Sequence, residues 1–445
     1  MPTQQISRRT FMGDAAATGL AFTIVPRHVL GGPGYRAPSD TLNIACIGVG
    51  GRGAASVRGV SGENVYALCD VDENSAGAML GRFSGAKRYK DFRVMLETER
   101  DNIDAVTVAT PDHTHAVASM MAMQMGKGVY CEKPLARSIW EVRQLSAAAQ
   151  RYGVATQMGN QGHANEGTRQ IREWVEAGAI GTVRTVELWT NRPIWPQAIN
   201  RPLEQYHVPA TLDWDLWLGP SPERPYHPAY APFRWRGWWD CGTGALGDIA
   251  CHSMDAAFWA LQLGYPTRVE AETTQLFPET APAVSRIVYD FPARGNLAPV
   301  KVVWRDGNLS PSRPEEIAAD RPWPIESSGQ MWVGDDGKLF AGIYGENPRL
   351  LDEDRHAELM ANPPGEKYPR SEGPHAEWIA ACKGGPRAGS SFAEHSGPLT
   401  HMVLLGNLAV RSGRVLELNP ENGQITNGAV PEELIRPEYR DGWGW

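Results

Sequence analysis

A glycine-rich turn between two apolar segments constrains the fold of this chain more than any other feature. The residues LNIACI lead into Gly48, Gly50 and Gly53, which have the spacing G-x-G-x-x-G, and a second apolar segment, NVYALC, ends on Asp70. The first glycine permits a tight turn, the second lets the backbone approach a pyrophosphate, and the third lets a helix pack closely on the strand. The order of strand, turn and acid favours a dinucleotide site over a plain turn of a parallel sheet.

The same turn predicts how a dinucleotide binds. Its pyrophosphate would lie at the N-terminus of the helix that follows, where free N–H groups and the helix dipole favour an anion. Asp70 is placed to accept hydrogen bonds from the adenosine ribose, and its carboxylate repels a 2′-phosphate. We therefore expect NAD as the cofactor, with NADP disfavoured, and we expect Gly51 and Arg52 to complete the binding loop.

The alternation of apolar runs with helical segments predicts an α/β fold. Short apolar runs at 105–110, 128–132 and 154–158 are typical of buried parallel strands, and helical segments separate them, so we expect a doubly wound sheet. After residue 164 strands predominate, which predicts a largely antiparallel sheet. Those later strands are expected at 183–190, 268–275, 285–291, 299–304 and 330–333. The predicted division is 1–40 for a signal and linker, 41–162 for the cofactor domain, and 163–445 for the substrate domain.

The N-terminus predicts export from the cytoplasm. The residues SRRTFM at positions 7–12 precede a mildly apolar run and match the twin-arginine pattern S-R-R-x-F-[LM]. This Tat route carries folded proteins, which suits a protein that takes up its cofactor before export. No clean A-x-A cleavage site follows, so the segment could remain as an anchor. We expect a periplasmic or otherwise exported protein that engages the Tat translocase.

Composition excludes several other classes of protein. The net charge is −8 and no basic run is present, which argues against nucleic-acid binding. No apolar span reaches 18 residues, so no transmembrane segment is predicted beyond a possible uncleaved signal. None of the six cysteines forms a C-x-x-C pair, and free thiols are expected.

Polar residues follow the predicted strands, at the edge where ligands bind in a doubly wound sheet. They occur in the segments TPDHTH, EKP and GNQGH. We expect them to surround the nicotinamide end of the cofactor. The residues predicted to contact the cofactor there are Thr110, Pro111, His113, His115, Glu132, Lys133 and Asn160.

Lys133 is the first catalytic candidate. Pro134 follows it and biases its backbone to an extended geometry at the end of a buried strand. A lysine aimed at the nicotinamide edge can hold a substrate hydroxyl and favour its alkoxide-like transition state. A surface lysine is the alternative, but the position after a buried strand favours a functional role.

Asp248 and His252 are the other catalytic candidates. They lie one helical turn apart if a helix begins after the glycines of GTGALGDIACH. The histidine can accept a hydroxyl proton while the aspartate binds a second hydroxyl or orients the imidazole. A helix cap plus a core histidine fits this spacing equally well. The pairs Asp248/His252 and His113/His115 also resemble metal ligands, but no third ligand is indicated by spacing, and no metal is predicted.

Tryptophans are concentrated between positions 189 and 239. Indole faces pack on the C–H faces of sugars, which favours a carbohydrate site, although packing between a loop and a sheet is the alternative. The expected substrate-binding residues are His163, Arg192, Trp195, His207, Arg236, Trp238, Asp248 and His252.

The segments GVGGRG, ATPDHTH, CEKPLA and GTGALGDIACH, in this order, resemble the Gfo/Idh/MocA oxidoreductases from about Leu42 to Gly413. The resemblance implies an N-terminal Rossmann domain and a C-terminal α/β domain with an open sheet that forms a homodimer or homotetramer interface. It implies NAD(P) dependence, a sugar or cyclitol substrate, and catalytic positions at Lys133, Asp248 and His252, the last as acid/base. Ala250 stands where many relatives have glycine, and the long aromatic insertion leaves the substrate open.

Three functions are compatible with these residues. The first is an oxidoreductase that transfers a hydride between NAD and a hydroxyl of a sugar, cyclitol or glycoside. The second, known from exported relatives, is an NAD-dependent glycosidase or lyase that oxidises a sugar carbon, usually C3, eliminates the leaving group, adds water and returns the hydride. The export motif keeps this second function open, because free NAD is scarce outside the cytoplasm. The third is a cofactor-holding binding protein, against which the intact Lys133, Asp248 and His252 argue.

Overall fold

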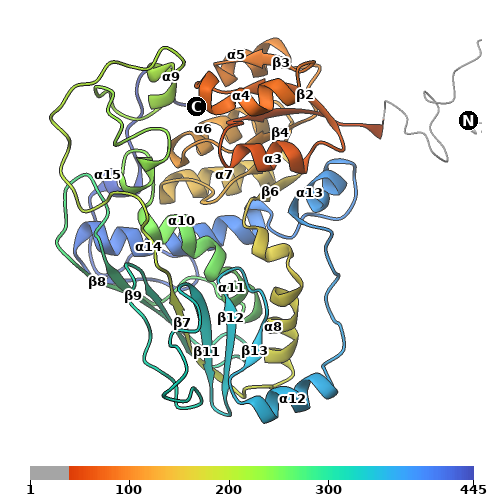
Figure 1. Cartoon of the computed structure of the whole chain (residues 1–445), viewed down its shortest axis with the longest axis vertical. Helices are drawn as coiled ribbons and strands as arrows, with labels where there is room; N and C mark the ends of the chain where they lie inside the picture. Colours follow the sequence, from red (N-terminus) through yellow and green to blue (C-terminus); the bar gives the residue numbers. More distant parts are fainter. Residues whose placement is uncertain (1–39) are drawn as a thin grey trace, which may run out of the picture. The chain divides into compact units, whose positions relative to one another are not determined.

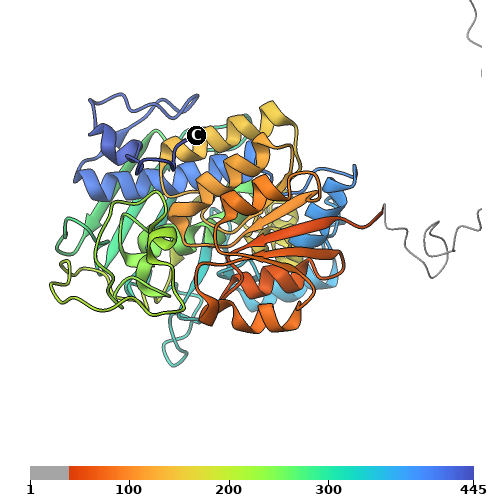
Figure 2. The same cartoon turned by 90° about the horizontal axis from the view of Figure 1, so that it is seen from above.

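The first sheet is parallel and doubly wound, as the sequence predicts. In the computed structural model, residues 40–445 are described, and the predicted Tat segment lies outside them. The strand order is β3-β2-β1-β4-β5-β6, with helices on both faces (Figures 1 and 2). Its strands are β1 (Asn43–Ile47), β2 (Asn64–Cys69), β3 (Lys87–Tyr89), β4 (Ala105–Val108), β5 (Gly128–Cys131) and β6 (Thr156–Met158). Its helices are α3 (Gly53–Gly59), α4 (Glu73–Arg82), α5 (Phe92–Thr98), α6 (Asp112–Gln124) and α7 (Ile139–Tyr152).

Local sequence explains these elements. Strands β4 and β5 are buried along their whole length, which accounts for their continuous apolar character. Helix α7 begins with a capping box between Ser138 and Glu141 and ends at Gly153, whose φ of 61° is the left-handed geometry that glycine permits. The order of strands reverses between β1 and β4, and ligands bind at such a switch point.

The second sheet has eight strands in the order β13-β12-β11-β7-β10-β9-β8-β14. Every neighbouring pair is antiparallel except β7 and β10, so the expected mostly antiparallel sheet is confirmed. Its strands are β7 (Val183–Trp189), β8 (Arg268–Thr273), β9 (Ser285–Phe291), β10 (Val300–Arg305), β11 (Gly329–Gly334), β12 (Lys338–Gly342), β13 (Arg349–Leu350) and β14 (Leu416–Glu417).

Helices fill the space between the two sheets. Helix α14 (Gly397–Ser412) contacts α7 of the first sheet and β8 of the second, and α10 (Gly244–Ser253) packs against α14 (Figure 1). Residues 43–445 form one compact unit. The predicted boundary near residue 162 falls between the two sheets, and its role as a domain boundary stays a prediction. The remaining helical elements are η2 (Gln161–Ala164), α8 (Glu166–Glu176), α9 (Trp214–Leu218), η3 (Arg234–Gly237), α11 (Asp255–Ala260), α12 (Glu353–Ala361), α13 (Pro374–Cys382), the π-helical η4 (Phe392–Ser396) and α15 (Glu432–Ile435).

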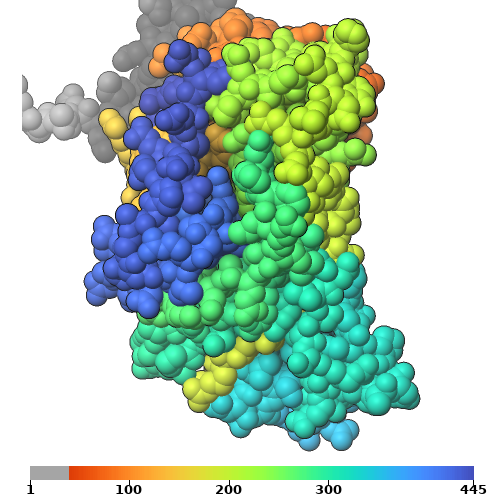
Figure 3. Space-filling model, turned by 90° about the vertical axis from the view of Figure 1, so that its left-hand side faces the viewer, coloured from red at the N-terminus to blue at the C-terminus, as the bar shows by residue number. Residues whose placement is uncertain are grey.

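The aromatic insertion between β7 and α10 packs against the first sheet. Its residues 211–217, which we call the strap, are joined to the loop after β2 by backbone hydrogen bonds: the N–H of Asp213 donates to the carbonyl of Val71 at 2.9 Å, and the N–H of Glu73 donates to that of Thr211 at 3.0 Å. The C-terminal segment lies beside the insertion (Figure 3), where Arg440 pairs with Asp215. None of the described helices has the length and apolar character needed to cross a bilayer.

Candidate active site

A cleft of about 490 Å³ lies at the carboxyl ends of β1, β2, β4 and β5. The glycine-rich turn after β1 forms part of its wall, and the first turns of α10 form another part. Ligands bind at this edge of a doubly wound sheet. The predicted site residues that line the cleft are Gly48, Gly50, Gly51, Arg52, Asp70, Thr110, Pro111, Glu132, Lys133, Arg236 and Asp248.

Two glycines of the turn are required by close backbone contacts. Gly48 has a φ of 74°, and a Cβ there would lie 2.7 Å from the carbonyl oxygen of Ala109. A Cβ on Gly53 would lie 1.9 Å from the carbonyl oxygen of Gly48. Side chains at these positions would push the turn away from the sheet, so both glycines keep the helix close to the strand, which is the geometry that a dinucleotide pyrophosphate needs.

Asp70 lies at the end of β2, as predicted, and lines the cleft. Its Oδ2 accepts hydrogen bonds from the N–H groups of Val49 and Gly50 at 2.8 and 3.1 Å, and its Oδ1 accepts one from Asp72 at 2.9 Å. Burial raises the pKa of Asp70, and these backbone donors oppose that rise. The carboxylate therefore also holds the glycine-rich turn in place, a role that the sequence did not predict.

The catalytic candidates Lys133 and Asp248 are in direct contact. The ammonium of Lys133 lies 2.7 Å from Oδ1 of Asp248, and Arg236 approaches the same oxygen at 3.2 Å. Burial alone would raise the pKa of Asp248, but the charges of Lys133 and Arg236 outweigh it and lower that pKa to about 2. Asp248 is therefore ionised at neutral pH and flanked by two cations.

His252 lies one helical turn beyond Asp248, outside the lining of the cleft. Its side chain is 4 % exposed, its ring packs edge-on against Tyr344 at 4.7 Å, and its Nδ1 has no hydrogen-bond partner among the described residues. Burial, followed by the charge of Lys133, lowers the pKa of His252 to about 3. The imidazole is thus neutral at physiological pH, the state in which it can accept a proton.

Asp112 is a cleft residue that the sequence analysis did not select. It begins α6, lines the cleft, and accepts a hydrogen bond from Oγ1 of Thr243 at 2.7 Å. Burial raises the pKa of Asp112 to about 7. A carboxyl group that titrates near neutral pH in a cleft is a candidate for proton transfer. Its position within ATPDHTH, directly after β4, could have indicated from the sequence that Asp112 lies in the cleft.

Arg52 and Glu132 form an ion pair in the cleft. Nε of Arg52 lies 2.9 Å from Oε1 of Glu132, and the hydroxyl of Ser56 donates to the same oxygen at 3.3 Å. Oε2 of Glu132 is buried and has no partner among the described residues. The pair joins the glycine-rich turn to the end of β5.

His113 and His115 were predicted to contact the cofactor, but the structure places both rings outside the cleft lining. Their exposures are 0 % and 1 %. The ring nitrogens of His113 lie 3.3 and 2.9 Å from the carbonyls of Cys241 and Trp217, and those of His115 lie within 2.9 Å of the carbonyls of Pro134 and Thr110. Burial lowers the pKa of both histidines, so each ring is neutral and donates its one N–H to a backbone carbonyl, which ties loops together.

Asn160 and His163 also lie away from the cleft lining. Both side chains turn toward Asp255 at the start of α11, 2.8 Å away for Asn160 and 3.0 Å away for His163. The sequence placed them by the carboxyl end of β6. Local sequence could not show that both side chains would instead contact Asp255, more than 90 positions later.

Of the predicted substrate residues in the aromatic insertion, Arg236 alone lines the cleft. Trp238 is fully buried and donates to the carbonyl of Ala229, and Trp195 is buried and donates to Gln197. Arg192 is directed to its neighbour Asn191, and His207 is exposed. These two tryptophans are therefore packing residues, although the predicted alternative was packing between the loop and the sheet, and Trp238 packs within the insertion itself.

A different set of insertion residues forms the cleft wall. The strap, the loop before η3 and η3 itself contribute apolar and aromatic side chains to the lining of the cleft. These residues are Leu212, Leu216, Trp217, Ala231, Pro232, Phe233 and Trp235. The density of aromatic residues in the sequence indicated that this region contributes to the site, but not which aromatic side chains line the cleft.

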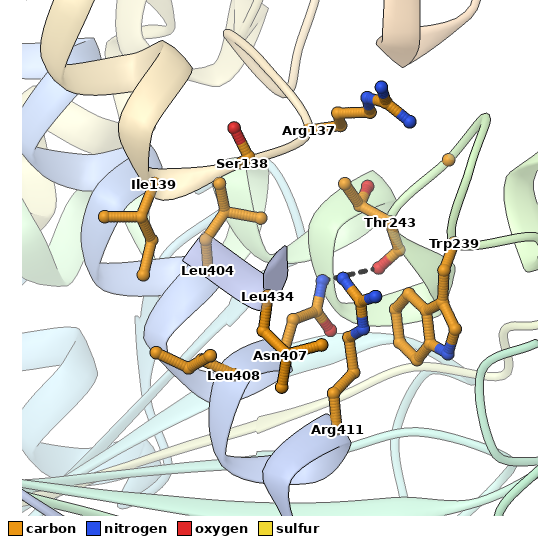
Figure 4. A pocket seen from close by; sticks show the side chains of 11 residues that line it. Arg137, Ser138, Ile139, Trp239, Thr243, Leu404, Asn407, Leu408, Arg411 and Leu434 are labelled. Atoms are coloured by element: carbon orange, nitrogen blue, oxygen red, sulfur yellow. Dashed lines mark hydrogen bonds between the residues drawn. The ribbon is translucent and has the colours of Figure 1, made fainter. Parts of the chain in front are cut away.

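A much smaller cavity, shown in Figure 4, lies at the start of α10. Its volume of about 20 Å³ excludes a sugar. The amide of Asn407 donates to the carbonyl of Thr243 at 2.8 Å, and Thr243 in turn donates to Asp112. This chain of hydrogen bonds connects α14, through the N-terminus of α10, to the cleft.

The fold and the cleft together define a class of protein: a dinucleotide-binding oxidoreductase with a second, mixed sheet beside its Rossmann-type domain. Two family models match the chain in that arrangement. Residues 42–160 match the NAD-binding Rossmann fold of the Gfo/Idh/MocA oxidoreductase family, and residues 165–298 match the C-terminal α/β domain of the same family. The chain therefore belongs to the Gfo/Idh/MocA family.

Curated relatives match over part of the chain. Inositol 2-dehydrogenase 3 of Saccharopolyspora erythraea is 29% identical over 185 residues, which are 40% of this chain and 54% of that protein. Myo-inositol 2-dehydrogenase of Thermotoga maritima is 26% identical over 180 residues, 40% of this chain and 52% of that protein. The chain thus spans about half the length of the curated relatives it matches.

A solved structure matches over most of the fold. The WlbA dehydrogenase of Bordetella pertussis, in complex with NADH and UDP-GlcNAcA, superposes with a TM-score of 0.58 at 17% identity, covering 85% of this chain and 99% of that one. At this identity the likeness shows the shared fold, with both sheets included.

Proposed function

We propose that the protein is an NAD-dependent oxidoreductase that transfers a hydride between NAD and a hydroxyl of a sugar, cyclitol or glycoside. The contact of Lys133 with Asp248 in the cleft, one helical turn from the neutral His252, carries this proposal. The family, its inositol dehydrogenase relatives and a neighbour solved with NADH and a sugar nucleotide support it.

The residues present suit a bound NAD. A Cβ on Gly51 would meet no other atom within 4 Å, so the turn is open at this point, and the carboxyl oxygens of Asp70 at the end of β2 disfavour a 2′-phosphate. When bound, NAD supplies an acceptor for the hydride of the substrate C–H. Gly48, Gly50, Gly51, Gly53, Arg52 and Asp70 would hold its pyrophosphate and adenosine, and Thr110, Pro111 and Glu132 would lie nearer its nicotinamide.

The chain's own residues handle the proton and the substrate. Lys133 donates a hydrogen bond to the reacting hydroxyl and stabilises the negative charge that develops on its oxygen. Asp248 holds Lys133 in place, and Arg236 pairs with Asp248; the carboxylate and the guanidinium offer an acceptor and donors to neighbouring hydroxyls. His252 accepts the hydroxyl proton once substrate brings that group within hydrogen-bond reach.

A redox-neutral glycosidase or lyase is the second candidate function, and the strap favours it. Its backbone hydrogen bonds to the loop after β2 place Leu212, Leu216 and Trp217 on the same cleft as Asp70. A cofactor covered in this way exchanges slowly, so the hydride would have to return within the same cycle or to a second substrate. The same Lys133, Asp248 and His252 serve both reactions.

We also propose export and self-association. The SRRTFM motif supports a Tat-exported, periplasmic protein that loads NAD before translocation. The second sheet is the surface through which we expect a homodimer or homotetramer to form, as the family resemblance implies. Gel filtration with light scattering, and fractionation of cells that express the full chain and an Arg8→Lys/Arg9→Lys variant, test these two points.

One assay on purified protein separates the two candidate reactions. The absorbance spectrum and the nucleotide released on denaturation show whether NAD is retained. The protein is then incubated with sugars and aryl glycosides while absorbance at ~340 nm and leaving-group release are followed together. NADH that accumulates with sugar establishes a dehydrogenase; leaving-group release without net NADH, lost when NAD is removed, establishes the redox-neutral reaction. If neither endogenous nor added NAD binds, the proposed function is wrong.

A further inference from the structure

Three side chains from distant parts of the sequence converge beside α10. They are His163 in η2, Asp255 at the start of α11 and His395 in η4. Nδ1 of His163 lies 3.0 Å from Oδ2 of Asp255, and Nε2 of His395 lies 2.5 Å from Oδ1. Among the described residues, this is the one group of three His, Cys, Asp or Glu side chains whose candidate ligand atoms all lie within 4.8 Å of one another.

All three side chains are buried, with exposures of 4, 1 and 6 %. The two imidazole rings lie 4.1 Å apart between centroids, so they converge on one carboxylate from neighbouring directions. An ionised carboxylate in the interior is costly unless cations or donors surround it. Here the two imidazole rings and the amide of Asn160 surround the carboxylate of Asp255.

A fourth polar side chain points into the same place and is only half satisfied. Asn160 is fully buried, and its Nδ2 donates to Oδ1 of Asp255 at 2.8 Å. Its Oδ1 is buried and has no hydrogen-bond partner among the described residues. The oxygen and nitrogen of such an amide are assigned from the surrounding hydrogen bonds, so a half-turn of the group would aim the oxygen at Asp255. Two oxygens in that position need a cation between them.

We propose that His163, Asp255 and His395 bind a divalent transition-metal ion, with Oδ1 of Asn160 as a fourth ligand. Two imidazole nitrogens with oxygen donors suit Zn²⁺ above Mg²⁺ or Ca²⁺, which prefer oxygen ligands alone. Ligand bonds of about 2.0–2.1 Å in a tetrahedron separate neighbouring ligand atoms by about 3.3 Å. The observed 3.0 Å between Nδ1 of His163 and Oδ2 of Asp255 is close to that separation, and the 2.5 Å between Nε2 of His395 and Oδ1 is shorter than it.

The alternative is an ordinary hydrogen-bonded cluster in which each histidine donates to Asp255. The 3.0 Å contact of His163 fits both descriptions, whereas the 2.5 Å contact of His395 is that of a direct hydrogen bond, from which the ring must move to admit an ion. The ion is favoured by the convergence of two imidazoles on one buried carboxylate, beside an Asn160 amide whose oxygen has no partner among the described residues. The ion would connect η2, α11 and η4 directly behind His252, which precedes Asp255 by less than one helical turn.

The test begins with metal content in the full chain. The protein is stripped with a chelator, incubated with Zn²⁺ alone, freed of unbound metal by gel filtration and analysed by mass spectrometry of its metals. We expect one Zn²⁺ per chain. Replacement by Co²⁺ is expected to give the visible ligand-field bands of a four-coordinate nitrogen and oxygen site. A Co²⁺ spectrum identical to that of the free aqueous ion overturns the proposal without any variant.

Two substitutions separate the metal site from the hydrogen-bonded cluster. The amide of His163→Asn replaces Nδ1, and the amide of His395→Gln replaces Nε2, so each variant keeps a donor for Asp255 but loses a metal ligand. We expect each to weaken Zn²⁺ binding at least about 100-fold, because even losing a group behind a ligand costs 10–100-fold. His401→Gln, at a buried histidine outside the cluster that contacts Tyr265 and Arg143, is the control and should bind Zn²⁺ as the parent does. Absence of stoichiometric Zn²⁺ in the parent, or unchanged affinity in both variants, overturns the proposal.

Discussion

At the residue scale, the candidate active site depends on two buried groups whose pKa values are both lowered, which leaves the carboxylate charged and the imidazole neutral. Asp248 is held ionised by Lys133 and Arg236, while His252, a turn away, is held neutral by burial. A fixed carboxylate beside a neutral imidazole is the combination that acid–base catalysis of hydride transfer needs. Local spacing was enough to predict that Asp248 and His252 share a helix face, and the strand-end position was enough to predict Lys133 near them.

Replacement of His252 tests its role directly. His252→Ala should lower turnover by about 10²- to 10⁴-fold, the usual contribution of a general base. The affinity for NAD should stay unchanged, since His252 does not line the cleft. Steady-state kinetics and nucleotide titration measure both quantities. Turnover near that of the parent protein would remove His252 from the mechanism.

Asp112 makes a pH-dependent contribution to stability. Its pKa is raised to about 7 in the folded protein, against about 4 in an unfolded chain. The preferential protonation of Asp112 in the folded state therefore stabilises the protein fully below about pH 4, and this stabilisation is lost as the pH rises to about 7. Asp112→Asn removes the titration and can still accept the Thr243 hydrogen bond. Relative to the parent, the variant should therefore gain stability between pH 5 and pH 8. Urea unfolding at both values checks this, and an equal difference at the two values would contradict it.

At the element scale, sequence patterns predicted the first sheet well and the second only in part. Buried parallel strands are continuous apolar runs, so β4 and β5 were apparent from the sequence. Strand β12 and helix α12 were missed. The parallel pairing of β7 with β10 joins segments more than 100 residues apart, and no local pattern encodes such a contact. For the same reason, the sequence did not reveal that Asn160 and His163 converge on Asp255.

The strap gives a prediction about cofactor exchange. Trp217 lines the cleft and stacks on Trp214 at 4.7 Å, so Trp217→Ala should open the wall and raise the rate of NAD release about tenfold or more. Tyr226→Ala is the matched control, since Tyr226 contacts Trp214 but lies outside the cleft lining. Nucleotide content after purification and the release rate in a chase experiment are the readouts. Equal retention in the two variants would show that the strap does not hold the cofactor.

At the scale of the whole molecule, the two sheets and the helices between them form one unit. Cofactor binding should therefore stabilise the protein as a whole. NAD at about 100 times its dissociation constant adds about 2.7 kcal/mol to the free energy of unfolding. NADP at the same concentration should add less, because Asp70 lies where a 2′-phosphate would approach. Thermal unfolding of nucleotide-stripped protein compares the two, and a larger shift with NADP would refute the assigned role of Asp70.

The C-terminal tail has a consequence for the timing of assembly. Trp443 is buried against Phe92, a residue of the cleft wall, and Arg93 lies over its indole at 3.9 Å. Trp443 thus supports the cleft wall through Phe92, a residue synthesised about 350 positions earlier. Phe92 gains this packing partner only after residue 443 has left the ribosome, so a nascent chain that has not reached that residue lacks the support that the tail gives to this wall.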